Sequence, residues 1–496
     1  MVTQKNKSLN SLTDTGIAYD DVLLVPQYSE VLPNDVSLST RLTKSINIKI
    51  PILSAAMDTV TESQMAISLA SAGGIGIIHK NMGIKEHADQ IRFVKKHESG
   101  VIREPLTASP GMTVDEIYGI TNKYNISGVP VVENNQLVGI ITSRDLRFVE
   151  NLDMKISQIM TPKDKLVTVR EDYTKEEVVS LLRENRIEKI LITNKKFELK
   201  GMITFKDIQK TSTYPDASKD TNGSLIVGGA IGTTDESIER AEALVSQGVD
   251  VLVIDTAHGH SRHVLNMLKY IKKNFKNQEV IVGNIATEDA ALDLIKAGAD
   301  ALKVGIGPGS ICTTRVVAGV GVPQLTAIMN VYKAARKSKI PIIADGGIRY
   351  SGDIAKALAA GADAVMIGSL LAGTDETPGE IFYYQGRSYK SYRGMGSISA
   401  MSRGSADRYF QQDIKDQLKL VPEGIEGRVP YRGPVKNIID QLVGGLKSSM
   451  GYLGAKNITE FQKNAKFIEI SNSGIKEGHV HDVQITKQSP NYPVNE

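Results

Sequence analysis

Cysteine, tryptophan and long apolar runs are scarce or absent in this chain of 496 residues. A single cysteine excludes a disulfide within the chain and a cysteine-rich zinc site, and it fits a reducing compartment. With no tryptophan, 5% aromatic residues and a net charge of +3, the chain lacks the stacking and basic surfaces of a nucleic-acid-binding protein. No apolar stretch reaches the roughly 20 residues that span a membrane. We therefore expect a cytoplasmic protein with neither a membrane nor a nucleic-acid partner.

The chain does contain a rhythm of short apolar runs, most followed by a segment with helical spacing such as Glu288–Ala297. The runs are Ile50–Met57, Ile75–His79, Leu225–Ile231, Val249–Thr256, Glu279–Asn284, Ala299–Gly305, Ile340–Asp345 and Ala362–Gly368. Buried strands that alternate with helices predict an α/β fold with a parallel sheet. Eight such units favour a closed (β/α)8 TIM barrel over the alternative, an open doubly wound sheet.

The rhythm stops between the second and third runs, where the sequence repeats itself. The segment that begins S-G-V-P-V-V at Ser127 is echoed from Glu188, and Gly139 is echoed 62 residues later by Gly201. Each copy follows an acidic helix start of the kind that complements a helix dipole, for example Thr113-Val114-Asp115-Glu116. Two units of this size are expected to pair and bury a shared core.

The repeats and the barrel runs together predict how the chain is divided. The barrel is assigned to residues 1–92 and 212–496, the two repeats to about 93–152 and 153–211, and a flap to about 374–434. The links are expected at Ser99-Gly100 and at Thr211–Gly223. The flap has little apolar periodicity, which is typical of a lid or of disorder. Tyr19–Pro26 predicts a short strand or hairpin, and Val435–Tyr452 predicts a helix.

The only cysteine lies in a glycine-rich loop, Gly305 to Arg315, with the sequence G-I-G-P-G-S-I-C-T-T-R. Glycines after an apolar strand let the backbone approach a bound group closely. Cys312 is therefore a candidate nucleophile, and the nearby charge of Arg315 would favour its thiolate. The alternative is a small residue buried for packing.

Small and acidic residues follow the other predicted strands, and the carboxyl ends of barrel strands meet on one face. Gly346-Gly347, Gly368-Ser369 and Ser310 could together bind a phosphate through backbone N–H groups. Asp345 could accept hydrogen bonds from a sugar, or it could cap the following helix. Asp255 ends another run on this face. The pattern predicts a phosphorylated, sugar-bearing ligand beside a thiolate.

Four motifs carry a resemblance to a known family. The cysteine loop, A-D-G-G-I-R, Y-R-G-M-G-S and A-D-R-Y-F-Q resemble inosine-5′-monophosphate (IMP) dehydrogenase, and the resemblance runs through the whole chain. The repeat pair resembles tandem cystathionine β-synthase (CBS) motifs, which in that family bind purine nucleotides. The guanosine-monophosphate (GMP) reductases share most of the cysteine loop, and the insertion and the flap are expected to separate the two.

The resemblance implies a mechanism. Cys312 attacks C2 of the hypoxanthine ring, a hydride passes to NAD⁺, and the flap carrying Arg408 and Tyr409 then closes into the dinucleotide site. Water hydrolyses the thioimidate to xanthosine monophosphate, within guanine nucleotide biosynthesis. The proton acceptor stays open among Arg408, Thr314 and Tyr409, because a guanidinium group normally keeps its proton.

The resemblance also implies binding residues. Contacts to the nucleotide are implied for Ser310, Asp345, Gly346, Gly347, Gly368, Ser369, Tyr392, Arg393, Gly394, Met395, Gly396 and Glu423. Contacts to NAD⁺ are implied for Asp255, Gly305, Ile306 and Gly307. A potassium ion is implied at the carbonyls of Gly307, Gly309 and Cys312, with Glu477, Gly478 and His479 contributed by a neighbouring copy in a homotetramer.

Two other functions remain open from the sequence. One is a GMP reductase-like enzyme of the same fold. The other is a nucleotide-sensing protein without turnover, in which the repeat pair is the functional part. The repeats themselves could be a regulatory site for a purine nucleotide or a plain spacer.

Overall fold

The computed structural model describes residues 15–97, 105–124, 126–205, 214–414, 416–487 and 489–492. The chain forms two compact units. The first comprises Met1–Lys95, Asp216–Asp220 and Leu225–Glu496, and the second comprises Lys96–Pro215 and Thr221–Ser224. The predicted link at Ser99-Gly100, residues 211–213 of the second link and the repeat residues Lys206-Asp207-Ile208 lie outside the described residues.

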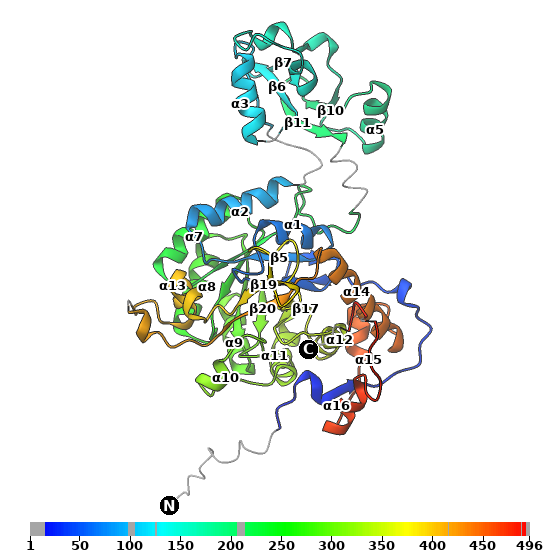
Figure 1. The fold of residues 1–496 in the computed structure, drawn as a ribbon, viewed down its shortest axis with the longest axis vertical. Coiled ribbons are helices and arrows are strands. Elements are labelled where there is room, and N and C mark those ends of the chain that lie inside the picture. The colour runs from blue at the N-terminus through cyan, green and yellow to red at the C-terminus, as the bar shows by residue number, and fades with distance from the viewer. Residues whose placement is uncertain are drawn as a thin grey trace, which may run out of the picture. The chain divides into compact units, whose positions relative to one another are not determined.

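The first unit is built on a closed barrel of eight parallel strands (Figure 1). Around the barrel the strands are β12 (Gly228–Ile231), β13 (Val251–Asp255), β14 (Glu279–Ile285), β15 (Ala301–Val304), β16 (Ile342–Asp345), β17 (Ala364–Ile367), β4 (Ile52–Ser54) and β5 (Ile75–Ile78). Each of the eight predicted runs matches one of these strands, and only β14 extends past its run, by one residue, so the TIM barrel is confirmed and the open sheet is excluded. The runs are apolar because a parallel barrel strand is covered on both faces.

Helices surround the barrel, and most of them connect consecutive strands, while α2 leads into the second unit and α14 follows the last barrel strand. They are α1 (Ser63–Ser71), α2 (Ile84–His97), α7 (Asp235–Ser246), α8 (Arg262–Asn274), α9 (Glu288–Ala297), α11 (Gln324–Ser338), α12 (Ser351–Ala359) and α14 (Val435–Tyr452). Helix α9 shows why these segments start and stop where they do. Thr287 accepts a hydrogen bond from the N–H of Ala290, and Gly298 ends the helix with a left-handed φ of 103°. Helix α14 has the predicted bounds.

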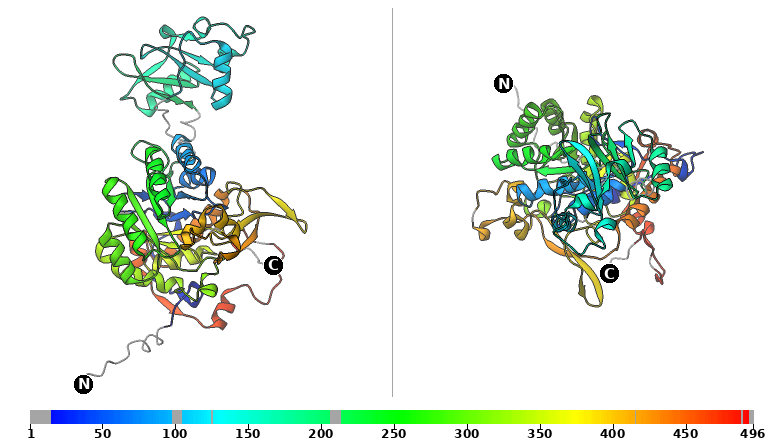
Figure 2. Two further views of the ribbon diagram at one scale, coloured as in Figure 1. Left: turned by 90° about the vertical axis from the view of Figure 1, so that its left-hand side faces the viewer. Right: turned by 90° about the horizontal axis from the view of Figure 1, so that it is seen from above.

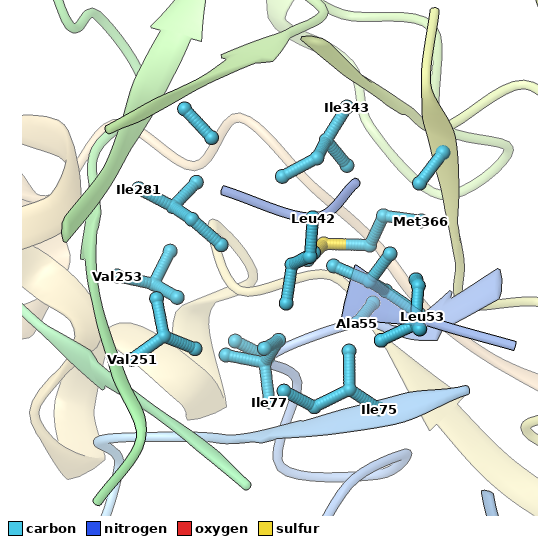
Figure 3. Packing of buried hydrophobic residues seen from close by; sticks show 14 of the residues in the cluster. Leu42, Leu53, Ala55, Ile75, Ile77, Val251, Val253, Ile281, Ile343 and Met366 are labelled. Atoms are coloured by element: carbon cyan, nitrogen blue, oxygen red, sulfur yellow. The ribbon is translucent and has the colours of Figure 1, made fainter. Parts of the chain in front are cut away.

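The barrel interior is filled by aliphatic side chains from alternate strand positions (Figure 3). Val251 and Val253 of β13 point inward together with Ile281 and Ile343 from neighbouring strands. Leu42 enters this core from the turn between β2 (Thr40–Arg41) and β3 (Asn47–Ile48), the hairpin that precedes β4. The hairpin thus closes the N-terminal end of the barrel.

Excursions from the barrel complete the first unit. Strand β1 (Val22–Leu24) pairs with β21 (Phe467–Glu469), which confirms the predicted N-terminal strand. The predicted irregular flap instead contains a three-stranded sheet, β18 (Phe382–Tyr384), β19 (Arg387–Arg393) and β20 (Glu426–Pro430), and Figure 2 shows its yellow β18–β19 hairpin projecting outward. The flap and the C-terminal region also contain α13 (Ile398–Arg403), a 3₁₀ helix at Ser405–Tyr409, α15 (Ile458–Asn464) and α16 (Asn472–Gly478). Strand β19 was not predicted, because its sequence, R-S-Y-K-S-Y-R, has no apolar face.

The second unit holds both repeats. The first contains α3 (Val114–Tyr124), β6 (Gly128–Glu133), β7 (Gln136–Thr142) and α4 (Ser143–Leu146). Strand β8 (Thr161–Pro162) lies beyond the predicted boundary at residue 152, but it pairs with β7 of the first repeat. The second contains β9 (Thr168–Arg170), α5 (Lys175–Glu184), β10 (Lys189–Thr193) and β11 (Leu199–Thr204). Leu137 and Ile140 of one repeat pack against Leu191 and Met202 of the other, so the repeats share a core as predicted.

No helix in the described part of the chain has the length and apolar character that crossing a bilayer requires.

Candidate active site

A cleft of about 970 Å³, measured to its open mouth, lies at the carboxyl ends of the barrel strands. It brings together most of the residues singled out in the sequence. Its lining includes Cys312, Thr314, Arg408, Tyr409, Ser310, Asp345, Gly346, Gly347, Gly368, Ser369, Tyr392, Gly394, Met395, Glu423, Asp255, Gly305, Ile306, Gly307 and Gly309. These residues come from strand ends and from the flap, which are far apart in the sequence and meet only because the barrel closes.

The cysteine loop is held from three sides. Cys312 is half-buried, with its Sγ 3.1 Å from Oγ1 of Thr314. The N–H of Thr313 donates to the carbonyl of Glu423 at 2.9 Å, which ties the loop to the flap. Arg315 donates from Nε to the carbonyl of Ile306 at 3.1 Å and from Nη2 to that of Val322 at 2.6 Å. The guanidinium group therefore anchors the loop by its hydrogen bonds, and it acts on Cys312 only through its charge.

Burial lowers the pKa of Arg315, and the charge of Cys312 opposes that effect. The loop needs its glycines because Arg315 lies directly over it. A Cβ on Gly307, where φ is +74°, would lie 2.7 Å from Cγ of Arg315. The sequence analysis predicted that the glycines let the loop backbone approach a bound group closely. The structure shows that they also let the backbone pack against the side chain of Arg315.

Lys303 is the main site residue that sequence reasoning missed. It lies on β15 with 1% of its side chain exposed, and its Nζ is 2.8 Å from Oδ1 of Asp255 and 2.5 Å from Oδ2 of Asp345. It also donates to Oδ1 of Asn284, whose Nδ2 donates to Oδ2 of Asp345 at 2.9 Å. One lysine within an apolar strand was the available signal, because a buried ammonium group needs charged or polar partners.

Asp345 is therefore held inside the cleft by Lys303 and Asn284. The alternative that it caps a helix is wrong, because α12 begins six residues later and has Tyr350 at its N-cap. The conformation of the next two residues explains why both are glycine. Gly346 and Gly347 have φ values of +91° and +81°, and a Cβ on Gly346 would lie 3.4 Å from the backbone nitrogen of Gly309.

Tyr392 lies beside the predicted phosphate site. A Cβ on Gly368 would lie 3.1 Å from the Tyr392 hydroxyl, and that hydroxyl is hydrogen-bonded to Ser310. Burial raises the pKa of Tyr392 to about 12, so the phenol is neutral and can donate a hydrogen bond at neutral pH. The combination of small residues and a neutral phenol suits an anionic group.

The flap reaches into the cleft from the opposite side. Nη1 of Arg408 donates to Oδ2 of Asp255, and the carbonyl of Arg408 accepts from the N–H of Ala257 at 3.0 Å. Tyr409 is packed against Gly396, and burial raises the pKa of its phenol. Arg408 and Lys303 thus share the Asp255 carboxylate, and the flap arginine lies where NAD⁺ was expected.

Five predicted residues lie outside the cleft lining. Arg393 turns away to pair with Asp58 at 2.6 Å, and Gly396 lies behind Tyr409. Glu477, Gly478 and His479 lie at the exposed end of α16, and Nδ1 of His479 is 2.9 Å from the Tyr492 hydroxyl. Their own chain does not bring these three residues to the Cys312 loop. Among the described residues, no group of three or more His, Cys, Asp or Glu side chains is arranged to hold a metal.

Comparison with known proteins identifies the family. The family profile described as "IMP dehydrogenase / GMP reductase domain" matches residues 16–481. The inosine-5′-monophosphate dehydrogenase of Aquifex aeolicus is 59% identical over 97% of this chain and 98% of that protein. The Escherichia coli K12 protein of the same name is 57% identical over 96% and 98%. The chain belongs to the IMP dehydrogenase family. The resemblance drawn from its motifs is confirmed.

A solved structure corrects one expectation about this family. A cysteine-to-alanine variant of the GMP reductase of Trypanosoma brucei, in complex with guanosine 5′-monophosphate, aligns with a TM-score of 0.87 and 41% identity. The alignment covers 96% of this chain and 100% of that one, so it must include most of residues 93–211 and 374–434. The expectation that an insertion and a long flap separate the two enzymes is therefore wrong. The higher identity to the named dehydrogenases separates them instead.

Proposed function

We propose that the protein oxidises IMP to xanthosine 5′-monophosphate and so contributes to guanine nucleotide synthesis. The observation that carries this proposal is the placement of Cys312 in one cleft with a glycine-lined anion site and the Lys303–Asp345 pair. Relatives that are 59% and 57% identical over almost the whole chain are named for this reaction. We also expect the protein to act in the cytoplasm.

We propose one orientation of IMP in the cleft, with its phosphate at the glycines and its base at Cys312. Its phosphate would accept hydrogen bonds from the backbone at Gly346-Gly347 and Gly368-Ser369 and from Ser310, all of which line the cleft, although the N–H of Gly346 also donates to the carbonyl of Met366 at 3.4 Å. The ribose hydroxyls would donate to Asp345, which Lys303 and Asn284 hold inside the cleft. The base would then lie over Cys312, between Met395 and Glu423 of the flap region.

Chemistry begins at Cys312. Its thiolate adds to C2 of hypoxanthine, and the hydride that leaves C2 is accepted by NAD⁺, which gives a thioimidate on the enzyme. Water then adds to C2, the C–S bond breaks and a proton is released. The balance is one IMP, one NAD⁺ and one water consumed, with xanthosine monophosphate, NADH and one proton produced. Asp255 and the turn at Gly305, Ile306 and Gly307 would hold the dinucleotide.

Hydrolysis is assigned to the conformation with the flap closed. Arg408 donates to the Asp255 carboxylate, and a guanidinium group normally keeps its proton, so we assign Arg408 to stabilising hydroxide rather than to removing a proton. Thr314, whose Oγ1 is 3.1 Å from Sγ of Cys312, would relay the proton. Tyr409 keeps its phenol protonated because burial raises its pKa, and it can only relay or donate.

A potassium ion and a neighbouring copy would complete the cysteine loop. Carbonyl oxygens at Gly307, Gly309 and Cys312 are hard ligands of the type that alkali cations take, although the Gly309 carbonyl also accepts from the N–H of Cys312 at 3.1 Å. Glu477, Gly478 and His479 are exposed and away from their own loop, so a second chain would have to supply them. A shared site requires an oligomer, and we propose the homotetramer that the family resemblance implies.

The inserted unit is proposed to bind a purine nucleotide as an effector. A cavity of about 950 Å³ is lined by residues of both repeats. Four cationic side chains line it, namely Arg144, Arg147, Lys165 and Lys189, together with Asp145, whose carboxylate accepts a hydrogen bond from Oγ1 of Thr142 at 2.6 Å. Cations suit phosphates, and a carboxylate suits a ribose.

The function is tested by assaying the purified full chain with IMP, NAD⁺ and potassium, while NADH and xanthosine monophosphate are followed together. Equal amounts of the two products, absent in Cys312→Ala, are expected. Consumption of GMP and NADPH without IMP oxidation would favour a reductase. Nucleotide binding at the inserted unit without turnover of either substrate would favour a sensing protein.

A further inference from the structure

A buried ion pair fastens the flap to the barrel one residue before Arg408. Nζ of Lys80, in the segment that follows β5, donates to Oδ1 of Asp407 in the 3₁₀ helix Ser405–Tyr409. Only 10% of the lysine side chain and 13% of the aspartate side chain are exposed. Desolvation lowers the pKa of Lys80, and the carboxylate of Asp407 opposes this by favouring the charged ammonium. The pair is therefore shielded enough to matter energetically, unlike most surface ion pairs.

The barrel leaves room for Asp407 at the exit of β12. A Cβ on Gly232 would lie 2.2 Å from Oδ2 of Asp407 and 3.0 Å from Oγ of Ser237. On the flap side, Oγ of Ser405 donates to the carbonyl of Met395 at 2.5 Å. These contacts fix the position of the 3₁₀ helix relative to the barrel. From that position the side chain of Arg408 reaches Asp255.

Neither Lys80 nor Asp407 lines the Cys312 cleft. Both instead line a separate, open cavity between flap residues and barrel residues, together with Arg240 and Arg403. The pair therefore contacts no reacting atom, and any effect on the chemistry must pass through the position of Arg408.

We infer that Lys80 and Asp407 are positioning residues that form a latch for the closed flap and are required for the hydrolytic half of the reaction. This inference rests on the proposed function. Arg408 and the dinucleotide both use Asp255, so the flap must leave and return in each cycle, and the latch forms only when it returns. A buried ion pair depends on both members, because the loss of one leaves the other unpaired and poorly solvated.

Lys80→Met tests the latch by kinetics. Hydride transfer occurs with the flap away from Asp255, so the first-turnover burst of NADH is expected to stay within about twofold of the wild-type rate, while steady-state turnover falls about 10- to 100-fold. Because a loosened flap competes less well with the dinucleotide, the KM for NAD⁺ is expected to fall together with kcat. Equal loss of burst and steady-state rates, or an unchanged kcat, would overturn the latch.

Lys95→Met is the matched control. Lys95 has 13% of its side chain exposed and pairs with Asp220 and Asp250, and it also donates to the carbonyl of Leu225, before the N-terminal end of β12. It is a shielded ion pair at the end of the barrel away from the flap. We expect Lys95→Met to leave the ratio of burst rate to steady-state rate unchanged.

Asp407→Asn and the double variant Lys80→Met with Asp407→Asn separate a latch from two independent effects. If the residues act as a pair, the double variant should lose no more hydrolytic activity than either single variant. Losses that multiply would overturn the pairing.

Hydrogen exchange of segment 404–410 in the protein without substrate gives a readout that needs no turnover. Exchange is expected to be about 10-fold faster in Lys80→Met and unchanged in Lys95→Met, because the closed flap protects this segment. Unchanged exchange in Lys80→Met would overturn the latch even if IMP is oxidised. Absence of IMP oxidation in the wild type would refute the proposed function and leave the exchange result to decide the latch.

Discussion

The two ends of the barrel are built from the same strands and have opposite chemistry. At the N-terminal end the inward positions are aliphatic, with Val251 and Val253 on β13 and Ile343 on β16, and Leu42 plugs the opening. Two residues further along the same faces the inward positions become Asp255 and Asp345. The comparison shows that one alternation of side chains builds both the core and the site.

The charged layer carries its own neutralising group. Lys303, two residues after the core residue Ala301 on β15, joins the two carboxylates, and Arg408 of the flap adds a second cation. A buried charged cluster is tolerated only when its members are paired and hydrogen-bonded. At the apolar end, substitutions that remove side-chain volume should lower stability. At the charged end, substitutions that remove a charge should lower stability or activity.

Lys303→Met should have the largest effect, because it removes the shared cation and leaves two buried carboxylates. We expect a loss of about 3 kcal/mol in the free energy of unfolding, by analogy with other broken buried pairs, and IMP oxidation reduced at least about 100-fold. Urea unfolding and steady-state assays measure the two losses. Ile343→Val, in the neighbouring core layer, is the control and should cost about 1 kcal/mol with activity kept. Equal losses of stability and activity in Lys303→Met and Ile343→Val would contradict the distinction between the charged layer and the apolar layer.

Arg408→Ala should reduce activity without reducing stability much, because Asp255 keeps its bond to Lys303. We expect the NADH burst to remain and hydrolysis of the thioimidate to slow about 100-fold, the size of effect typical of a lost electrostatic stabiliser. Rapid-mixing measurement of NADH beside xanthosine monophosphate separates the two steps. Arg403→Ala in the same flap is the control. Equal slowing of both steps would contradict the assignment.

Leu42→Ala tests the apolar end alone. A fully buried leucine in a packed core is expected to cost about 2–4 kcal/mol on truncation, through lost transfer energy and a residual cavity. Activity per folded molecule should stay near the wild-type value, since the hairpin lies at the end away from the cleft. Loss of activity in molecules shown to be folded by circular dichroism would mean that the two ends are coupled.

Asp363→Asn should have the smallest effect and depends on pH. Asp363 precedes β17, accepts the N–H of Ile342 at 2.9 Å, and has its pKa raised to about 6, mainly by burial. A carboxyl whose folded-state pKa exceeds its unfolded value binds protons more tightly when folded, so stability falls as pH rises from about 4 through 6. The substitution should remove that slope and stabilise the protein at pH 7 by roughly 1–2 kcal/mol. Parallel unfolding curves for both proteins between pH 4 and pH 7 would contradict it.

The fold was largely predictable because barrel strands are short, apolar and regularly spaced. All eight runs match a strand, and Val435–Tyr452 is a helix with the predicted bounds. The flap was not predictable in the same way, because a polar strand such as β19 is held by cross-strand pairing and by Arg428 of β20, which lies 5.2 Å over the ring of Tyr389. Such partners are distant in sequence, so no local sequence pattern predicts them.

By itself, the sequence determined the barrel, the cysteine loop and the glycines predicted to bind the phosphate, since each rests on local periodicity or on residue chemistry. Only the tertiary structure decided that Lys303 joins Asp255 to Asp345, that Arg408 lies on Asp255, and that Lys80 holds Asp407. A charged residue shows in the sequence that it needs a partner. Which partner it finds depends on how the closed barrel brings strand ends and flap together.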